Sequence, residues 1–264
     1  MLRVGFSSCP NDTFMFHGLV HGVVPDAPAL QVVMEDIEAL NRRALEPGAD
    51  ALPITKLSVG AWVRAREAYD VLDAGAALGR GCGPLVVGPR AMGFSELQGC
   101  RIAVPGLRTT AYALLRMFGP QHEPVPMRFD QVMPAVESGE VDAGLIIHES
   151  RFTYPHHGLT RIADLGEVWE AETGLPLPLG VIAARRTLEA STKQAFERGL
   201  AASVRHAWAN PEASRAYVEA HAQEMAREVC ERHIALYVND FSVSLGDEGG
   251  AALETFAERF AALP

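Results

Sequence analysis

The chain has 264 residues, of which 48% are hydrophobic, and its formal net charge is −10 at pH 7. This length allows one large domain or two modest ones, and the hydrophobic fraction is enough to fill real cores. Lys and Arg are scattered along the chain, which argues against a nucleic-acid partner because phosphate binding needs clustered positive groups. We therefore expect a globular protein whose acidity keeps it soluble.

The N-terminal residues, MLRVGFSSCPND, show neither a charged leader with an apolar core nor a small-residue cleavage site, and they lead directly into a predicted strand. No window approaches the roughly 20 apolar residues needed to cross a bilayer. Cys9, Cys82, Cys100 and Cys230 lack the paired spacing of a zinc or redox site, so we interpret them as free, mostly buried thiols. These features predict a cytoplasmic protein with no membrane partner.

Short apolar or β-branched runs, which we predict to be strands, alternate with helical patterns in the first part of the chain. The predicted strands lie at 2–7, 30–35, 51–55, 69–74, 84–88, 101–105, 125–129, 143–147 and 179–184. The predicted helices between them include 56–67, 109–118 and 130–138. Most strand runs are continuous, which is typical of strands buried on both faces of a parallel sheet. The pattern predicts an α/β fold.

After Arg185, helical patterns follow one another to the C-terminus with hardly a strand among them. Pro211 suits the first turn of a helix, and Asp247 with Glu248 suits a helix start. We expect this helical C-terminal segment to wrap a sheet formed earlier in the chain.

Residues 96–115 and 130–146 resemble the second lobe of the type II periplasmic-binding-protein fold. In that fold a strand leads through a Gly-containing turn into a helix that starts with Thr, and a later helix, Gly turn and strand return to the cleft. The resemblance implies two α/β lobes around a central cleft. We expect lobe one to combine residues 1–89 with 184–264, and lobe two to span 90–183.

Polar clusters follow four of the predicted strands. SSCPNDTF follows the first, TKLS the third, GLRTT the strand at 101 and HES the strand at 143. Ligands of open parallel sheets bind beyond the carboxyl ends of the strands, where helix N-termini offer unpaired N–H groups. We therefore expect the four clusters to converge on one cleft.

Two of these clusters have a structural interpretation as well as a functional one. Asn11, Asp12 and Thr13 are explained at least as well by a cap on the first helix as by contact with a ligand. Lys56 and Ser58 are alternatively solvated residues of a first helical turn. We favour a binding role for them because a carboxylate ligand in the cleft would need a cation.

The other two clusters carry the sharper hypotheses. Thr109 and Thr110 suit a helix N-cap, and capping does not exclude anion binding because both use the same geometry. His148 directly follows a predicted buried strand, where a purely structural histidine is an equal alternative. An imidazole titrates near neutral pH, so at a cleft-facing strand end it can take a proton and return it. Glu149 and Arg151 either orient His148, pair with each other or start the next helix.

Metal and phosphate sites are not favoured. His17 and His21 lie one helical turn apart, but no acidic third ligand or Glu general base lies between them. The Gly-rich run at 79–84 lacks the Lys-Ser/Thr ending of a phosphate loop, and we expect it to form a tight connection near the cleft. We predict no metal.

Six stretches together resemble the 1,4-dihydroxy-6-naphthoate synthase family, which acts in the futalosine route to menaquinone. They are SSCPNDTFMFHGLVHG, LPITKLS, GRGCGPLVV, VPGLRTTAYALL, GLIIHESRFTYP and TGLPLPLG. The resemblance runs in register from about residue 3 to about residue 245, and Ser8 stands where the family suggests proline.

The resemblance implies a lyase that converts cyclic dehypoxanthinyl futalosine into 1,4-dihydroxy-6-naphthoate without a metal or organic cofactor. It implies that His148 accepts the proton that starts a carbon–carbon cleavage, after which aromatisation drives the reaction. The residues that it places around the substrate are Lys56, Leu57 and Ser58 on one lobe and Thr109 and Thr110 on the other.

Two other functions stay open. Chorismate dehydratase, from the same pathway, shares the fold, although the stretch HESRFTYP favours the naphthoate synthase. A cytoplasmic binding protein would hold a small-molecule carboxylate without turnover. The sequence leaves the oligomeric state unknown.

Overall fold

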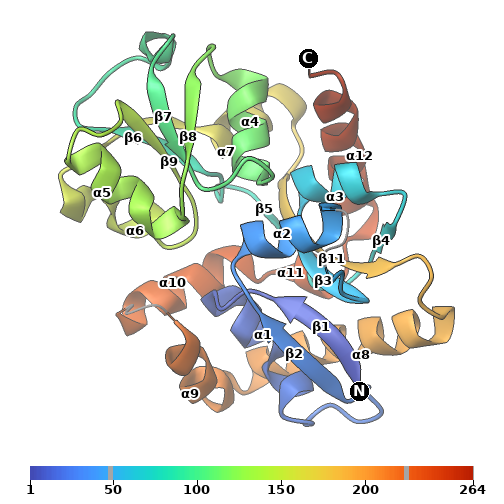
Figure 1. Ribbon diagram of the computed structural model, residues 1–264. Coiled ribbons are helices and arrows are strands. Elements are labelled where there is room, and N and C mark those ends of the chain that lie inside the picture. The colour runs from blue at the N-terminus through green and yellow to red at the C-terminus, as the bar shows by residue number, and fades with distance from the viewer. Residues whose placement is uncertain (47–49, 223–225, 264) are drawn as a thin grey trace.

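The structure, a computed structural model, describes residues 1–46, 50–222 and 226–263. The strands of these residues form two β-sheets, which lie in separate halves of the molecule with helices around them (Figure 1). The α/β class expected from the sequence is confirmed.

In the first sheet the strand order is β2-β1-β3-β11-β4, and β5 also pairs with β11. Its strands are β1 (Leu2–Phe6), β2 (Leu30–Met34), β3 (Ile54–Ser58), β4 (Tyr69–Val71), β5 (Ala77–Gly79) and β11 (Leu177–Arg185). In the second sheet the order is β10-β6-β9-β7-β8. Its strands are β6 (Leu85–Gly88), β7 (Arg101–Val104), β8 (Glu123–Pro126), β9 (Ala143–Ile146) and β10 (Thr160–Asp164).

The described α-helices are α1 (Pro10–Val20), α2 (Ile37–Leu45), α3 (Val59–Ala65), α4 (Thr110–Phe118), α5 (Val132–Glu137), α6 (Ser150–Thr153), α7 (Leu165–Thr173), α8 (Ala190–Ala209), α9 (Pro211–His221), α10 (Arg227–Tyr237), α11 (Asp240–Val243) and α12 (Gly246–Ala261). Short 3₁₀ helices occupy Phe94–Leu97, Phe129–Gln131 and Tyr154–His157.

Both sheets are mixed, so the expectation of parallel sheets was wrong. β1 is parallel to β2 and β3, but β11 is antiparallel to β3, β4 and β5. In the second sheet β7 is parallel to β8 and β9, whereas β6 is antiparallel to β9 and β10. The antiparallel pairs all involve β6 or β11, which are the strands that follow a crossing between the sheets. A continuous apolar run reports burial on both faces but not strand direction.

The third strand lies later than predicted. β3 begins at Ile54 and ends at Ser58, and α3 begins at Val59, whereas the sequence suggested a strand at 51–55 and a helix from residue 56. Lys56 is therefore part of a central strand rather than of a helical turn, and its polar side chain hid this from the apolar pattern. β5 and β10 were not predicted, because β5 has three residues and β10 carries charged ones.

The C-terminal helices return to the first sheet, as expected. α8, α9 and α10 pack against α1, and α12 contacts α3 and β11 (Figure 1).

The chain passes from the first sheet to the second between β5 and β6 and returns between α7 and β11. The expected ranges, 1–89 with 184–264 and 90–183, differ from this strand membership at β6 and over most of β11.

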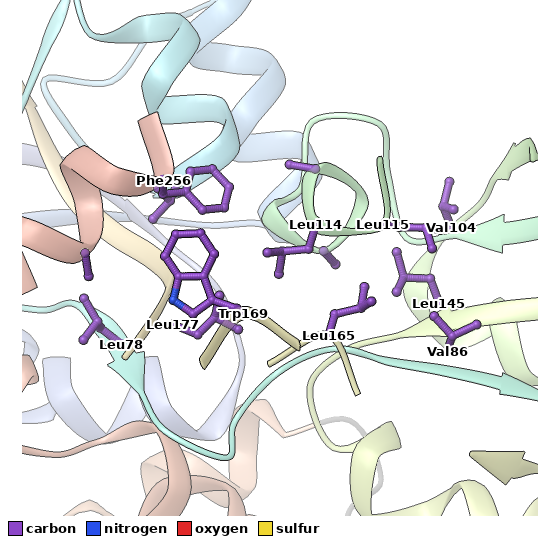
Figure 2. Close-up of a cluster of buried hydrophobic side chains, with 14 of the residues drawn as sticks. Leu78, Val86, Val104, Leu114, Leu115, Leu145, Leu165, Trp169, Leu177 and Phe256 are labelled. Atoms are coloured by element: carbon purple, nitrogen blue, oxygen red, sulfur yellow. The ribbon is translucent and has the colours of Figure 1, made fainter. Parts of the chain in front are cut away.

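A single hydrophobic cluster joins the two halves (Figure 2). Leu78 and Leu177 come from the first sheet, and Leu165 and Trp169 come from the beginning and middle of α7 in the other half. Trp169 is fully buried, its ring centroid lies 5.8 Å from that of Phe256 in α12, and its Nε1 donates to the Pro176 carbonyl. The cluster therefore fixes how one sheet sits against the other.

We predict that Trp169→Ala lowers the free energy of unfolding by about 3–5 kcal/mol, because it removes a buried aromatic side chain and leaves a cavity. Urea denaturation measures this loss. The control is Trp208→Ala, whose side chain is 40% exposed and whose loss should cost about 1 kcal/mol or less. Equal losses in the two variants would contradict a joining role for the Trp169 cluster.

Candidate functional site

A cavity lies between the two halves of the molecule. Strands of the first sheet line one side, and loops and helix starts of the other half line the opposite side. Its volume is about 640 Å³, including the part that opens to solvent. Of the residues predicted from the sequence, the ones that line it are Asn11, Lys56, Ser58, Thr109, Thr110 and His148. The Gly-rich connection also reaches it, through Cys82, Gly83 and Pro84.

Asp12 lies outside the cavity lining and is fully buried. Its Oδ1 accepts hydrogen bonds from Lys56 Nζ at 2.5 Å and from Asn11 Nδ2 at 3.0 Å. Its Oδ2 accepts from the Ser7 amide at 3.0 Å and from Ser7 Oγ at 2.6 Å. Asp12 therefore holds residues that line the cavity. It does not cap α1, because the N-cap of that helix is Cys9.

Lys56 and Ser58 are buried and project from the same face of β3, since alternate residues of a strand share a face. The solvated interpretation of these two residues is therefore wrong. Asn41 fixes Ser58: its Oδ1 accepts from the Ser58 amide and its Nδ2 donates to Ser58 Oγ, both at 3.0 Å. Leu57 points to the opposite face, where it packs in a hydrophobic cluster with Tyr69.

Thr109 is the N-cap of α4, as the sequence suggested. Its Oγ1 accepts from the Tyr112 amide at 3.2 Å and donates to the Gly106 carbonyl at 2.8 Å. Thr110 Oγ1 donates to the Leu179 carbonyl of β11 at 2.6 Å, which ties the two halves together beside the cavity. Because the first amides of a helix have no partner within it, the start of α4 offers N–H groups to an anion.

His148 follows β9, where the sequence placed it, and has a positive φ of 57°. This left-handed conformation is uncommon for a residue other than glycine and turns the chain sharply at the end of the strand. Its ring packs edge-on against Phe129, with centroids 5.1 Å apart. Cys9 Sγ, from the other half of the molecule, lies 3.4 Å from His148 Nδ1.

Burial and the nearby Lys56 ammonium lower the pKa of His148 to about 4, while Asp12 opposes the shift. The pKa of His148 therefore lies below the ordinary value of about 6.5 that the sequence suggested. The imidazole is neutral at pH 7 and can accept a proton, and its protonated form returns that proton readily.

Cys9 was not predicted as a site residue. Burial raises the pKa of its thiol to about 12, so the sulfur keeps its proton at neutral pH. The thiol that contacts the His148 ring is therefore neutral. The only hint in the sequence was its place in the cluster after the first strand.

Arg151 lines the cavity but does not pair with Glu149 as one hypothesis had it. Its Nη2 donates to Asp164 Oδ2 at 2.7 Å and its Nη1 donates to the Gly83 carbonyl at 2.5 Å. Gly83 approaches Gly166 so closely that a Cβ on Gly83 would lie 2.2 Å from the Gly166 nitrogen. The Gly-rich connection is therefore clamped against the start of α7.

Two further residues of the cavity wall, His233 and Tyr237, come from α10 and were not predicted. They lie one helical turn apart, and their ring centroids are 4.6 Å apart. His233 Nε2 lies 3.1 Å from Asn11 Oδ1, and Tyr237 Oη donates to the Cys82 carbonyl at 3.3 Å. Their spacing of four residues was the only sequence signal.

Within the described ranges, no group of three or more His, Cys, Asp or Glu side chains is arranged to hold a metal ion. The helices of the same residues include none with the length and apolar character needed to span a membrane.

A family model described as "Menaquinone biosynthesis" matches residues 2–262. The chain belongs to this family. Two curated relatives named 1,4-dihydroxy-6-naphthoate synthase are similar to it over nearly their full lengths. The protein from Thermus thermophilus is 52% identical over 260 residues, covering 97% of this chain and 93% of that one. The Streptomyces coelicolor protein is 47% identical over 267 residues, covering 99% and 93%. The resemblance stated from the sequence is confirmed.

Solved structures agree on the fold. A protein from Archaeoglobus fulgidus has a TM-score of 0.93 at 38% identity and covers 99% of this chain and 97% of its own. The periplasmic aliphatic sulphonate binding protein of Escherichia coli has a TM-score of 0.68 at 14% identity, covering 98% and 86%. The two-lobed, periplasmic-binding-protein-like fold expected from the sequence is confirmed.

The ion pair between Lys56 and Asp12 gives a test of stability. We predict that Lys56→Met lowers the free energy of unfolding by about 3–5 kcal/mol, because the Asp12 carboxylate would stay buried without its cation. Adding Asp12→Asn should restore at least half of the loss, because it removes that charge. Urea denaturation of the single and double variants measures both effects.

The matched control is the exposed pair of Arg161 and Glu167, where Arg161→Met should cost about 1 kcal/mol or less. Additive losses from Lys56→Met and Asp12→Asn would show that the two buried charges do not depend on one another.

Proposed function

We propose that this chain is a lyase that converts cyclic dehypoxanthinyl futalosine into 1,4-dihydroxy-6-naphthoate in the cavity between the two halves. Membership of the menaquinone biosynthesis family and the names of two relatives that match nearly the whole chain support this function. The observation that carries the mechanism is a neutral imidazole, that of His148, at the wall of the cavity between the two halves.

His148 is the general base in this proposal. It takes a proton from the bound substrate, a carbon–carbon bond of the substrate breaks, and the ring system becomes aromatic. The sugar-derived fragment leaves as a three-carbon ketose. Because the imidazole is held neutral, no proton has to leave it before the reaction begins.

The substrate carboxylate binds at the start of α4 in this proposal, where Thr110 and Ala111, the first two residues of the helix, line the cavity. Ser58 Oγ accepts a bond from Asn41, so its own proton is available to a carboxylate oxygen. Lys56 is a weaker anchor than the sequence suggested, because Asp12 already balances much of its charge. Asn11 contributes by orienting its neighbours.

We also propose that the boundaries of the two lobes lie within residues 80–84 and 174–176, where the chain passes between the sheets. The pairing of β6 with β9 and of β11 with β3 supports these boundaries. A cytoplasmic location is part of the proposal. All four cysteines are free, which suits a reducing compartment.

The direct test is incubation of the purified protein with cyclic dehypoxanthinyl futalosine and detection of 1,4-dihydroxy-6-naphthoate by mass spectrometry. Binding without any product would favour a binding protein that performs no reaction. Dehydration of chorismate by the same preparation would favour the dehydratase instead. We expect product only from the futalosine derivative.

We predict that His148→Asn lowers kcat by roughly 100- to 10,000-fold, because asparagine cannot accept a proton near neutral pH. Product should still bind, since the carboxylate anchors are untouched. His156→Asn is the control, because His156 is exposed and lies outside the cavity lining. A folded His148→Asn variant with turnover within about tenfold of wild type is incompatible with a base of this strength.

The pKa of His148 predicts an unusual pH profile for kcat/KM, which reports groups of the free enzyme. The base works only when it is neutral, so activity should stay level as the pH falls from about 7 and should decline only toward a pH of about 4. An ordinary histidine would lose half the activity near pH 6.5, at its unperturbed pKa of about 6.5. Circular dichroism at each pH separates this effect from unfolding.

A further inference from the structure

His233 lines the cavity from α10, is 1% exposed, and has two ring nitrogens with different surroundings. Nε2 lies 3.1 Å from Asn11 Oδ1. Nδ1 is buried and has no hydrogen-bond partner among the described residues. Because buried polar groups are nearly always paired in folded proteins, this nitrogen points to a partner that the protein itself does not supply.

Neighbouring residues fix which nitrogen carries the proton. Asn11 Nδ2 donates to Asp12 Oδ1, and a carboxylate oxygen accepts but does not donate, so the amide oxygen of Asn11 faces His233. Nε2 must then be the donor in the bond to that oxygen. Burial, with His148 and Lys56 nearby, lowers the pKa of His233 well below its ordinary value, so the ring stays neutral. Nδ1 therefore keeps its lone pair and acts only as an acceptor.

The place of His233 suggests what the missing donor is. Its ring stacks beside that of the proposed base, His148, with centroids 6.2 Å apart and an interplanar angle of 28°. A carboxylate at Nδ1 would set two acceptors against each other, whereas a hydroxyl group would supply the donor. The start of α4 and Ser58 already provide a separate place for the carboxylate in the same cavity.

We propose that His233 is a specificity-determining residue, whose Nδ1 accepts a hydrogen bond from a hydroxyl group of the substrate next to His148. This inference rests on the proposed function for the chemical class of the ligand, a hydroxylated aryl carboxylate. His233 thus selects ligands that carry a hydroxyl beside the base. Asp12, acting through Asn11, sets the tautomer that makes this selection possible.

The test compares two ligands that differ only in their hydroxyls, 1,4-dihydroxy-6-naphthoate and 2-naphthoate. Isothermal titration calorimetry measures both affinities for the wild type and for His233→Gln. The glutamine amide can replace the Nε2 donor to Asn11, but it does not restore an acceptor at the Nδ1 position. We expect the wild type to prefer the hydroxylated ligand by about tenfold, the worth of one hydrogen bond, and the variant to lose that preference.

A measurement on the unmodified protein covers the case in which the variant does not fold. In protein labelled with ¹⁵N-histidine, Nδ1 of His233 should resonate as an unprotonated nitrogen in the free state. Saturation with 1,4-dihydroxy-6-naphthoate should shift that resonance, and 2-naphthoate should not. A protonated Nδ1 in the free protein, or the same shift with both ligands, would overturn the inference.

The outcomes also separate this inference from the proposed function. If the wild type forms product from the futalosine derivative but His233→Gln keeps the full hydroxyl preference, the inference fails and the function stands. If no product forms but the preference depends on His233, the inference stands and the lyase function fails. If neither naphthoate binds the wild type, the inference is wrong.

Discussion

The site depends on one buried carboxylate, that of Asp12. It holds the Lys56 ammonium on β3, the Asn11 amide on α1 and both donors of Ser7 after β1. Through Asn11 the same network reaches His233 on α10, which comes from the far end of the sequence. A charge buried this deeply is tolerated only when paired and hydrogen-bonded, so the elements that meet at Asp12 must keep their relative positions.

The two halves meet beside the cavity through close contacts. Trp169 packs between strands of the first sheet and α12, and Gly83 touches the backbone of Gly166. Arg151 adds charge-assisted bonds to Asp164 and to the Gly83 carbonyl at the same junction. These contacts bring His148, from the second half, within hydrogen-bonding distance of Cys9 from the first. The proposed base therefore lies where residues of both halves meet.

The sequence predicted the α/β class, the helical return to the first sheet and the position of His148 after β9, because apolar runs and helical periodicity report burial directly. It missed the bounds of β3. Lys56 interrupts the apolar pattern, although its charge is buried against Asp12. It also missed Cys9 and His233, whose roles arise from contacts between distant segments. The lowered pKa of His148 has the same origin, because burial by tertiary packing leaves no local signal.

In the proposed mechanism this fold holds His148 neutral beside the cavity that accepts the substrate. The most direct measurement is the titration of His148 in the ligand-free protein by NMR of its labelled imidazole, assigned by comparison with His148→Asn. We expect a midpoint at a pH of about 4, with the ring neutral throughout the neutral range. A midpoint near the ordinary histidine pKa of about 6.5 would contradict it, because the ring would then be solvated rather than held by the protein.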